Sequence, residues 1–403
     1  MNKDKLLLFI CLFISFLVSM NIWFSWGGNY RYINMVLAIV MVYVFIQGEI
    51  QWNIRFTNIT AFILLAIGYL GWGNAYFQFI DVFNIISVLV TYFVILCLKD
   101  NDKEVCIKKI TTWFAYLLLP SVLLYFITSF ASIPSFGKIQ VGDAYLPYDN
   151  YILLVKSPYY QFRFCGPFLE PGHLGMMISF LLLANQYDFR KWEVIFLTLV
   201  NLLTFSLAGY VLSAIGYFFV SVIQHRITFK RIAFTTVLLF GFYLFSVHYN
   251  NGDNVFNKKI IERLQFDKKK GIVGNNRVYG NIDKYYQALF KNNDALWNGY
   301  DVAKISSWKK SGSDGTGYKI FLIKHGIIGL FVTSLFYLYV IFKCNRYNRK
   351  YAFLFFVFII LAFIQRCYPY WTSWIMCYVF GIATYQNIAL RKLIASHLPL
   401  YEH

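Results

Sequence analysis

Apolar residues occur in runs of about twenty that recur along the whole chain, separated by shorter segments that carry most of the charge. A run of this length, wound as a helix, crosses a hydrocarbon layer of roughly 30 Å. The runs and their flanking charges predict about twelve spans, at residues 6–26, 31–47, 58–73, 77–98, 110–130, 167–185, 192–207, 208–223, 232–249, 318–342, 351–364 and 373–390. The sequence therefore predicts an all-α, polytopic integral membrane protein.

The segments between the runs differ in basic charge on their two sides. Lys or Arg occurs in every segment that we place in the cytoplasm, at residues 47–58, 99–109, 186–191, 224–231 and 343–350. The short turns on the other side, at 27–30, 73–78 and 207–209, are almost devoid of basic residues. Because Lys and Arg accumulate on the cytoplasmic side of membrane proteins, both termini are predicted to be cytoplasmic.

The runs 192–207 and 208–223 are short, and only Ala208 and Gly209 separate them. A single tilted helix in their place would reverse the orientation of everything that follows. The basic clusters at 343–350 and 391–392 would then face outward, so we predict two spans.

Two outward segments are longer than a turn requires, and long loops on a rigid scaffold usually carry the function. In the second, apolar stripes at helical spacing predict two amphipathic helices, one with Phe256, Ile260 and Leu264 and the other with Val278, Ile282, Tyr285 and Leu289. The predicted organisation is spans one to five in 1–130, a first large outer loop in 131–166, spans six to nine in 167–249, a second large outer loop in 250–317, and spans ten to twelve with a cytoplasmic tail in 318–403.

Composition agrees with a membrane protein, since 59% of residues are hydrophobic and 14% are charged, against roughly 25% charged in soluble proteins. The formal charge of +18 would suggest nucleic acid in a soluble protein. Here 18 of the 37 Lys and Arg residues lie in the predicted cytoplasmic segments, so topology explains much of the charge and no nucleic acid is expected. Residues 250–325 hold 14 Lys or Arg against 7 Asp or Glu, a balance that should attract an anion.

The densest candidate chemistry lies just before the sixth span. A Pro-Gly pair at the predicted helix entrance leaves backbone amides facing outward, where the helix dipole favours an anion. Arg163 could grip a phosphate with two parallel hydrogen bonds. Glu170 and His173 are three residues apart, so they would share a helical face and could move a proton.

These residues also have a purely structural interpretation, in which Glu170 pairs with Arg163 and His173 lies at the interface. Ionisable groups at a membrane mouth are costly and tend to be kept for use, so we favour function for Arg163 and Glu170. For His173 both interpretations stay open.

In the second loop, Arg277 shares a predicted helical face with Lys284, and such a basic face can receive a diphosphate. A solvated face is the commoner explanation for a single lysine, and it applies to Lys284. His325 and Arg366 also fall near the outer mouth, and we interpret each as structural. The outer loops contain no Asp-x-Asp pair and no His cluster at ligand spacing, so neither a metal nor a cofactor is predicted.

Three short motifs support a family resemblance: Arg163-x-x-Gly166-x-Phe168-x-Glu170-Pro171-Gly172, Leu203 to Ser206, and Gly326 to Gly329. With the predicted topology they resemble the O-antigen polymerase (Wzy) family. The resemblance implies a GT-C-like architecture and the joining of lipid-linked oligosaccharide repeat units at the outer face of the bacterial inner membrane, without metal. That family relies on arginines in both large outer loops, and Arg163 and Arg277 match those roles.

The related O-antigen ligases usually show a His-Asn pair before the span that follows the large loop, whereas residues 313–318 here read Ser-Asp-Gly-Thr-Gly-Tyr. This difference favours a polymerase of O-antigen, capsule or exopolysaccharide over a ligase-type transferase or a lipid-linked glycan transporter. The implied partners are a polyprenyl-diphosphate-linked oligosaccharide donor and acceptor, membrane lipid, a chain-length regulator and a flippase. Arg163 and Arg277 would hold the donor diphosphate, and Glu170, with His173 as the rival base, would act on the attacking hydroxyl.

Overall fold

The computed structural model describes most of the chain. The described residues are 2–71, 79–141, 146–160, 162–224, 241, 243–244, 246–254, 257–262, 266–267, 271–272, 280–300, 317–344, 349–366 and 368–397. Arg277 and most of the predicted span 232–249 lie outside them.

A helix lies at each predicted span that falls within the described residues. The helices are α1 (Lys3–Ser19), α2 (Tyr30–Gln47), α3 (Phe56–Leu70), α4 (Phe79–Cys97), α5 (Asp100–Phe130), α6 (Pro171–Ala184), α7 (Trp192–Leu203), α8 (Leu207–Ile223), α14 (Gly317–Phe342), α15 (Arg349–Gln365) and α16 (Thr372–His397). Of these, α2, α5 and α14 are long and apolar enough to cross a membrane, and several others are shorter apolar helices. The described part is thus mostly helical and of a composition suited to a membrane.

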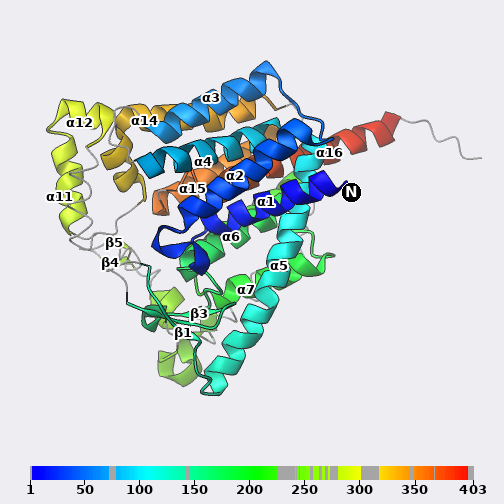
Figure 1. The fold of residues 1–403 in the computed structure, drawn as a ribbon. Coiled ribbons are helices and arrows are strands. Elements are labelled where there is room, and N and C mark those ends of the chain that lie inside the picture. The colour runs from blue at the N-terminus through cyan, green and yellow to red at the C-terminus, as the bar shows by residue number, and fades with distance from the viewer. Residues whose placement is uncertain are drawn as a thin grey trace, which may run out of the picture.

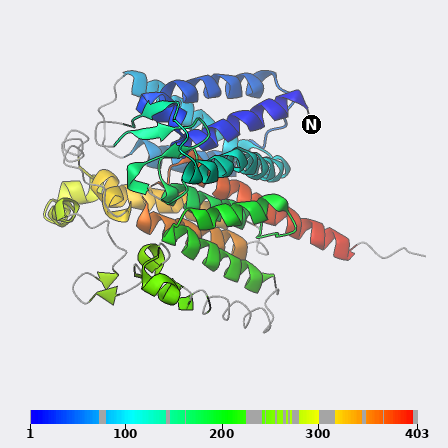
Figure 2. The same cartoon turned by 90° about the horizontal axis from the view of Figure 1, so that it is seen from below.

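The helices form a bundle with two distinct ends (Figure 1, Figure 2). The amino terminus and the end of α16 lie at one end, which we call the basic end because Lys5, Lys103, Lys343 and Arg391 gather there. The opposite end, called here the mouth end, holds the start of α6, which contacts the α1–α2 connection through a hydrogen bond from Trp23 N to the Pro167 carbonyl of 3.0 Å.

The predicted break within residues 192–223 is confirmed. The chain forms two helices, α7 and α8, joined by a turn in which Phe205 has φ 47° and Ser206 caps α8 by accepting a hydrogen bond from Gly209 N. The two helices pack side by side, since Asn201 Nδ2 donates to Ser213 Oγ at 2.8 Å.

Three helix boundaries differ from the prediction by about two turns or more, and one of them is the end of α16, which continues to His397 instead of residue 390. The first helix stops at Ser19, because Asn21 adopts φ 57° and the chain continues as a short helix, η1 (Trp23–Gly28). The fifth begins about three turns early, so the predicted turn 99–109 is helical. Its first turns are amphipathic, with Glu104 only 2% exposed and paired with Lys108 and Arg391.

The first large loop contains strands that the all-α prediction overlooked. Strands β1 (Gly137–Ile139), β2 (Tyr148–Asn150) and β3 (Val155–Lys156) form an antiparallel sheet in that order, followed by the short helix η2 (Pro158–Tyr160). Buried Tyr148 and Val155 pack with Trp26, Cys165 and Leu169, so the sheet is fastened to the chain that leads into α6. A local apolar cluster, rather than a periodic sequence pattern, fixes this sheet.

The second large loop is described in part, by η3 (Tyr249–Gly252), η4 (Asn257–Ile261), the paired strands β4 (Phe266–Asp267) and β5 (Gly271–Ile272), α11 (Gly280–Leu289) and α12 (Asn293–Asn298). The second predicted amphipathic helix is confirmed from Gly280 onward as α11, which buries Ile282 and Leu289 against α12 and α14. Val278 lies outside the described residues. In the first predicted helix, Phe256 and Leu264 lie outside the described residues. Helices α11 and α12 lie over the mouth end (Figure 1).

Helix α14 is broken where this loop docks on it. Gly326 has φ 59°, and a Cβ atom there would lie 2.2 Å from the Trp297 carbonyl oxygen. We expect Gly326→Ala to lower the free energy of unfolding by about 1–3 kcal/mol, through strain and the clash. Thermal unfolding in detergent measures this, with Gly241→Ala as the control because a Cβ at Gly241 meets open space. Equal midpoints for the two variants would contradict the prediction.

Candidate functional site

The start of the buried helix α6 carries two of the predicted catalytic residues, Glu170 and His173. Every residue of α6 except Gly172 is buried, and the helix packs against α8 and α16. Pro171 occupies the first helical position, which suits its fixed φ, and Glu170 is the N-cap residue with extended backbone angles. Glu170 makes no side-chain capping hydrogen bond. Its carboxylate is turned toward another part of the chain.

The partner of the Glu170 carboxylate is Arg366, in the short connection between α15 and α16. Arg366 Nη2 donates to Glu170 Oε2, and the two side chains are only 14% and 12% exposed. The structural alternative named Arg163 as the partner of Glu170, whereas this ion pair is with Arg366. A Cβ at Gly172 would lie 3.1 Å from Arg366 Nη2, so the glycine leaves room for the guanidinium.

The electrostatics of this pair keep the guanidinium charged. Burial acts to lower the pKa of Arg366, but the negative charge of Glu170 and the contact with Tyr368 outweigh it and raise that pKa above its ordinary value. The guanidinium of this buried pair therefore stays charged.

His173 is buried beside the pair. Its side chain is 2% exposed, and Nε2 is 3.8 Å from Glu170 Oε2. The imidazole meets Tyr368 and Trp371 edge to face, with ring centroids 5.1 Å away in each case. Tyr368 and Trp371 stack on each other at 3.9 Å. His173 is thus placed to support Glu170, and it has almost no surface to offer a substrate.

Arg163 is half-buried and holds the end of α7. Its Nε donates to the Thr204 carbonyl at 3.0 Å, and Phe164 N donates to the Leu203 carbonyl at 2.9 Å. A cation at a helix C-terminus is favourable for both the carbonyls and the dipole. The guanidinium carbon also lies 5.7 Å from the centre of the Tyr160 ring. Two of the motifs that carry the family resemblance therefore meet in space.

In the second loop, Lys284 is exposed on α11, as a solvated face requires. Arg277 precedes that helix and lies outside the described residues.

The connection between α15 and α16, residues 366–371, joins the site to the second-loop side of the bundle. The Tyr370 ring contacts Phe321 and His325 of α14, and its hydroxyl bonds Thr333. Its carbonyl accepts a hydrogen bond from Tyr92 of α4. These contacts hold Tyr370 between α4 and α14, four residues after Arg366.

No family model, curated protein or solved structure matches the chain. Within the described ranges, no three His, Cys, Asp or Glu side chains are placed to hold a metal ion.

The sequence interpretation of Arg366 as merely structural missed its contact with Glu170. One signal was present, because Arg366 is an ionisable residue between two apolar runs, where such a residue is costly unless paired. The aromatic residues around His173 gave no signal, since aromatic side chains are frequent throughout this chain.

Proposed function

We propose that the protein is a polysaccharide polymerase that joins polyprenyl-diphosphate-linked oligosaccharides by inverting, metal-independent glycosyl transfer at the outer face of a bacterial inner membrane. The observation that carries the proposal is the buried Glu170–Arg366 pair at the start of α6. The first-loop sheet packs on the chain that leads into this helix. Buried charge pairs of this kind are expensive, and at a membrane mouth they are a common mark of a functional site.

In the proposed reaction, a hydroxyl oxygen of the acceptor glycan attacks the anomeric carbon of the donor. The bond from that carbon to the diphosphate oxygen breaks with inversion, the hydroxyl proton passes to Glu170, and polyprenyl diphosphate leaves. Arg163 and Arg277 hold the diphosphate and stabilise the charge that develops on it; removing one such donor typically costs about 10²–10³ in rate.

Glu170 has the role of orienting and then deprotonating the acceptor hydroxyl. Its pairing with Arg366 makes the carboxylate a fixed, ionised hydrogen-bond acceptor and a modest base. A modest base suffices because diphosphate is a good leaving group. Since His173 is buried behind Glu170, we assign it the support of the carboxylate rather than contact with substrate.

A ligase-type transferase and a lipid-linked glycan transporter are the alternatives. Polymerase is favoured over transport because the Glu170–Arg366 pair lies at the mouth end, whereas a transporter places its ionisable sites near the bilayer midplane.

The three functions separate in one assay, in which purified protein is incubated with a single synthetic lipid-diphosphate oligosaccharide. We expect a ladder of longer lipid-linked products, because one compound serves as both donor and acceptor. Transfer only to an added second acceptor would contradict this result and indicate a ligase. Unchanged substrate from a folded protein would indicate transport or binding.

A further inference from the structure

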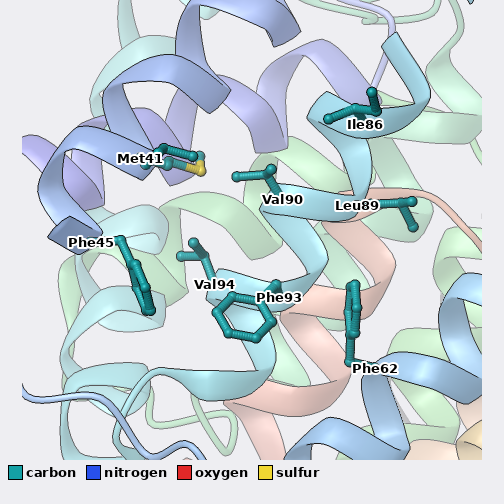
Figure 3. Close-up of a pocket in the computed structure, with 9 residues that line it drawn as sticks. Met41, Phe45, Phe62, Ile86, Leu89, Val90, Phe93 and Val94 are labelled. Carbon is teal, nitrogen blue, oxygen red and sulfur yellow. The ribbon is translucent and has the colours of Figure 1, made fainter. Parts of the chain in front are cut away.

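An apolar groove opens between α2, α3 and α4, away from the candidate site (Figure 3). It has a volume of about 350 Å³, and all its lining residues are apolar. They include Met41 and Phe45 of α2, Phe62 of α3, and Val90 and Phe93 of α4. Two other lining residues, Val42 and Ile86, are 40% and 51% exposed, so the groove opens at the side of the bundle.

The groove lies toward the basic end. Met41 and Phe45 fall in the last two turns of α2, which ends at Gln47, and Phe93 lies close to the end of α4 at Cys97. Both helices end where α5 begins, among the basic side chains defined above. The groove is thus in the half of the bundle opposite the Glu170–Arg366 pair.

Aromatic rings close the groove at this end. Phe93 contacts Phe45 and Phe62 edge to face, with centroids 5.7 and 5.6 Å away. Beyond them, the Trp52 ring lies 4.9 Å from that of Phe45. Trp52 Nε1 is buried and has no hydrogen-bond acceptor among the residues that the structure describes. A tryptophan at the end of an apolar surface is typical of the membrane–water interface.

Two basic side chains, those of Lys99 and Arg55, lie close to Trp52 along the chain or through its backbone pairing. Trp52 pairs through its backbone with Leu98, the residue before Lys99, and Lys99 Nζ bonds the Gln51 side chain. Arg55 is exposed three residues after Trp52. The nearby carboxylates are engaged, with Glu49 accepting from Asn2 and Asp100 paired with Lys103.

We propose that this groove binds one acyl chain of an anionic phospholipid, with the headgroup phosphate held by Arg55 and Lys99. An open apolar channel in contact with the bilayer takes up a hydrocarbon chain rather than water, and basic sites beside such channels recognise anionic headgroups. Under the proposed function, the tail of a lipid-linked sugar is a poorer occupant, because its diphosphate would lie at the mouth end. The binding of an anionic phospholipid does not otherwise depend on the proposed activity.

The test compares retention of phosphatidylglycerol and phosphatidylcholine with identical acyl chains, by native mass spectrometry of the full-length protein. Wild type should retain phosphatidylglycerol in preference. Val42→Trp, which fills the groove, should remove bound lipid of both kinds. Ile39→Trp is the matched control, because Ile39 lies one turn earlier on α2, is 63% exposed and does not line the groove.

Headgroup recognition is tested by a second variant on the surface, which avoids any risk to folding. Arg55→Gln should weaken retention of phosphatidylglycerol about fivefold and leave phosphatidylcholine unchanged. Arg190→Gln, which removes an 86% exposed charge elsewhere, should change neither.

The proposal would be overturned if the two tryptophan variants retained equal amounts of lipid, if wild type showed no preference for phosphatidylglycerol, or if Arg55→Gln retained as much phosphatidylglycerol as wild type. Displacement of phosphatidylglycerol by equimolar polyprenyl phosphate would also overturn it and would assign the groove to an isoprenoid tail. A change in oligomeric state in Val42→Trp without loss of lipid would assign it to a second copy of the chain.

Discussion

Arg366→Met is expected to abolish chain growth and to lower the free energy of unfolding by about 3–5 kcal/mol. The variant leaves the Glu170 carboxylate, which is only 12% exposed, without its cationic partner. Removing one member of a buried pair costs more than the pair contributes, because the remaining charge is uncompensated. Denaturant unfolding in detergent measures the stability, and the lipid-linked oligosaccharide assay measures chain growth.

The double variant Glu170→Gln/Arg366→Met separates structure from chemistry. Since neither charge remains, most of the stability should return, whereas chain growth should not, because the carboxylate that acts on the acceptor hydroxyl is missing. Arg190→Met is the matched control. Arg190 also pairs with a carboxylate, that of Asp188, but is 86% exposed, so its loss should cost less than about 1 kcal/mol. Chain growth at the wild-type rate in the double variant would exclude Glu170 from the reaction.

Arg163→Ala and Arg277→Ala are each expected to reduce chain growth by at least about a hundredfold while the protein still inserts in the membrane. Each removes a guanidinium assigned to the donor diphosphate. Arg277→Lys should recover little, because an ammonium group cannot make two parallel hydrogen bonds to phosphate. The product ladder measures the loss, and membrane fractionation confirms insertion.

Arg163 needs a further control because it also bonds the Thr204 carbonyl at the end of α7. Losing that hydrogen bond should cost about 1 kcal/mol of stability, too little to unfold the protein. A normal elution profile in size-exclusion chromatography therefore separates lost chemistry from lost fold. Lys284→Ala, at an exposed position on α11, should keep most of the activity. A full-length polymer distribution in either arginine variant would refute its assignment.

Hydrophobic periodicity located the helices well, for a simple reason. In an apolar environment the backbone must satisfy its own hydrogen bonds. A helix does this within a single segment, so each long apolar run is expected to form one. The same logic found α11, where the stripe Ile282, Tyr285 and Leu289 faces the neighbouring helices. Hydrophobic periodicity did not predict the first turns of α5, because they are polar on the outside and bury a charged residue, Glu104, on the inside. It also did not predict the small sheet around Tyr148.

The candidate site was predictable only in part. The sequence by itself determined that Glu170 stands at a helix entrance with His173 one turn inside, because Pro171 and the apolar run after it fix where α6 begins. Only the tertiary structure decided that the guanidinium on Glu170 belongs to Arg366, 196 residues away, and that His173 is enclosed by Tyr368 and Trp371. Such contacts depend on which helices pack together, and local residue spacing carries no information about that choice.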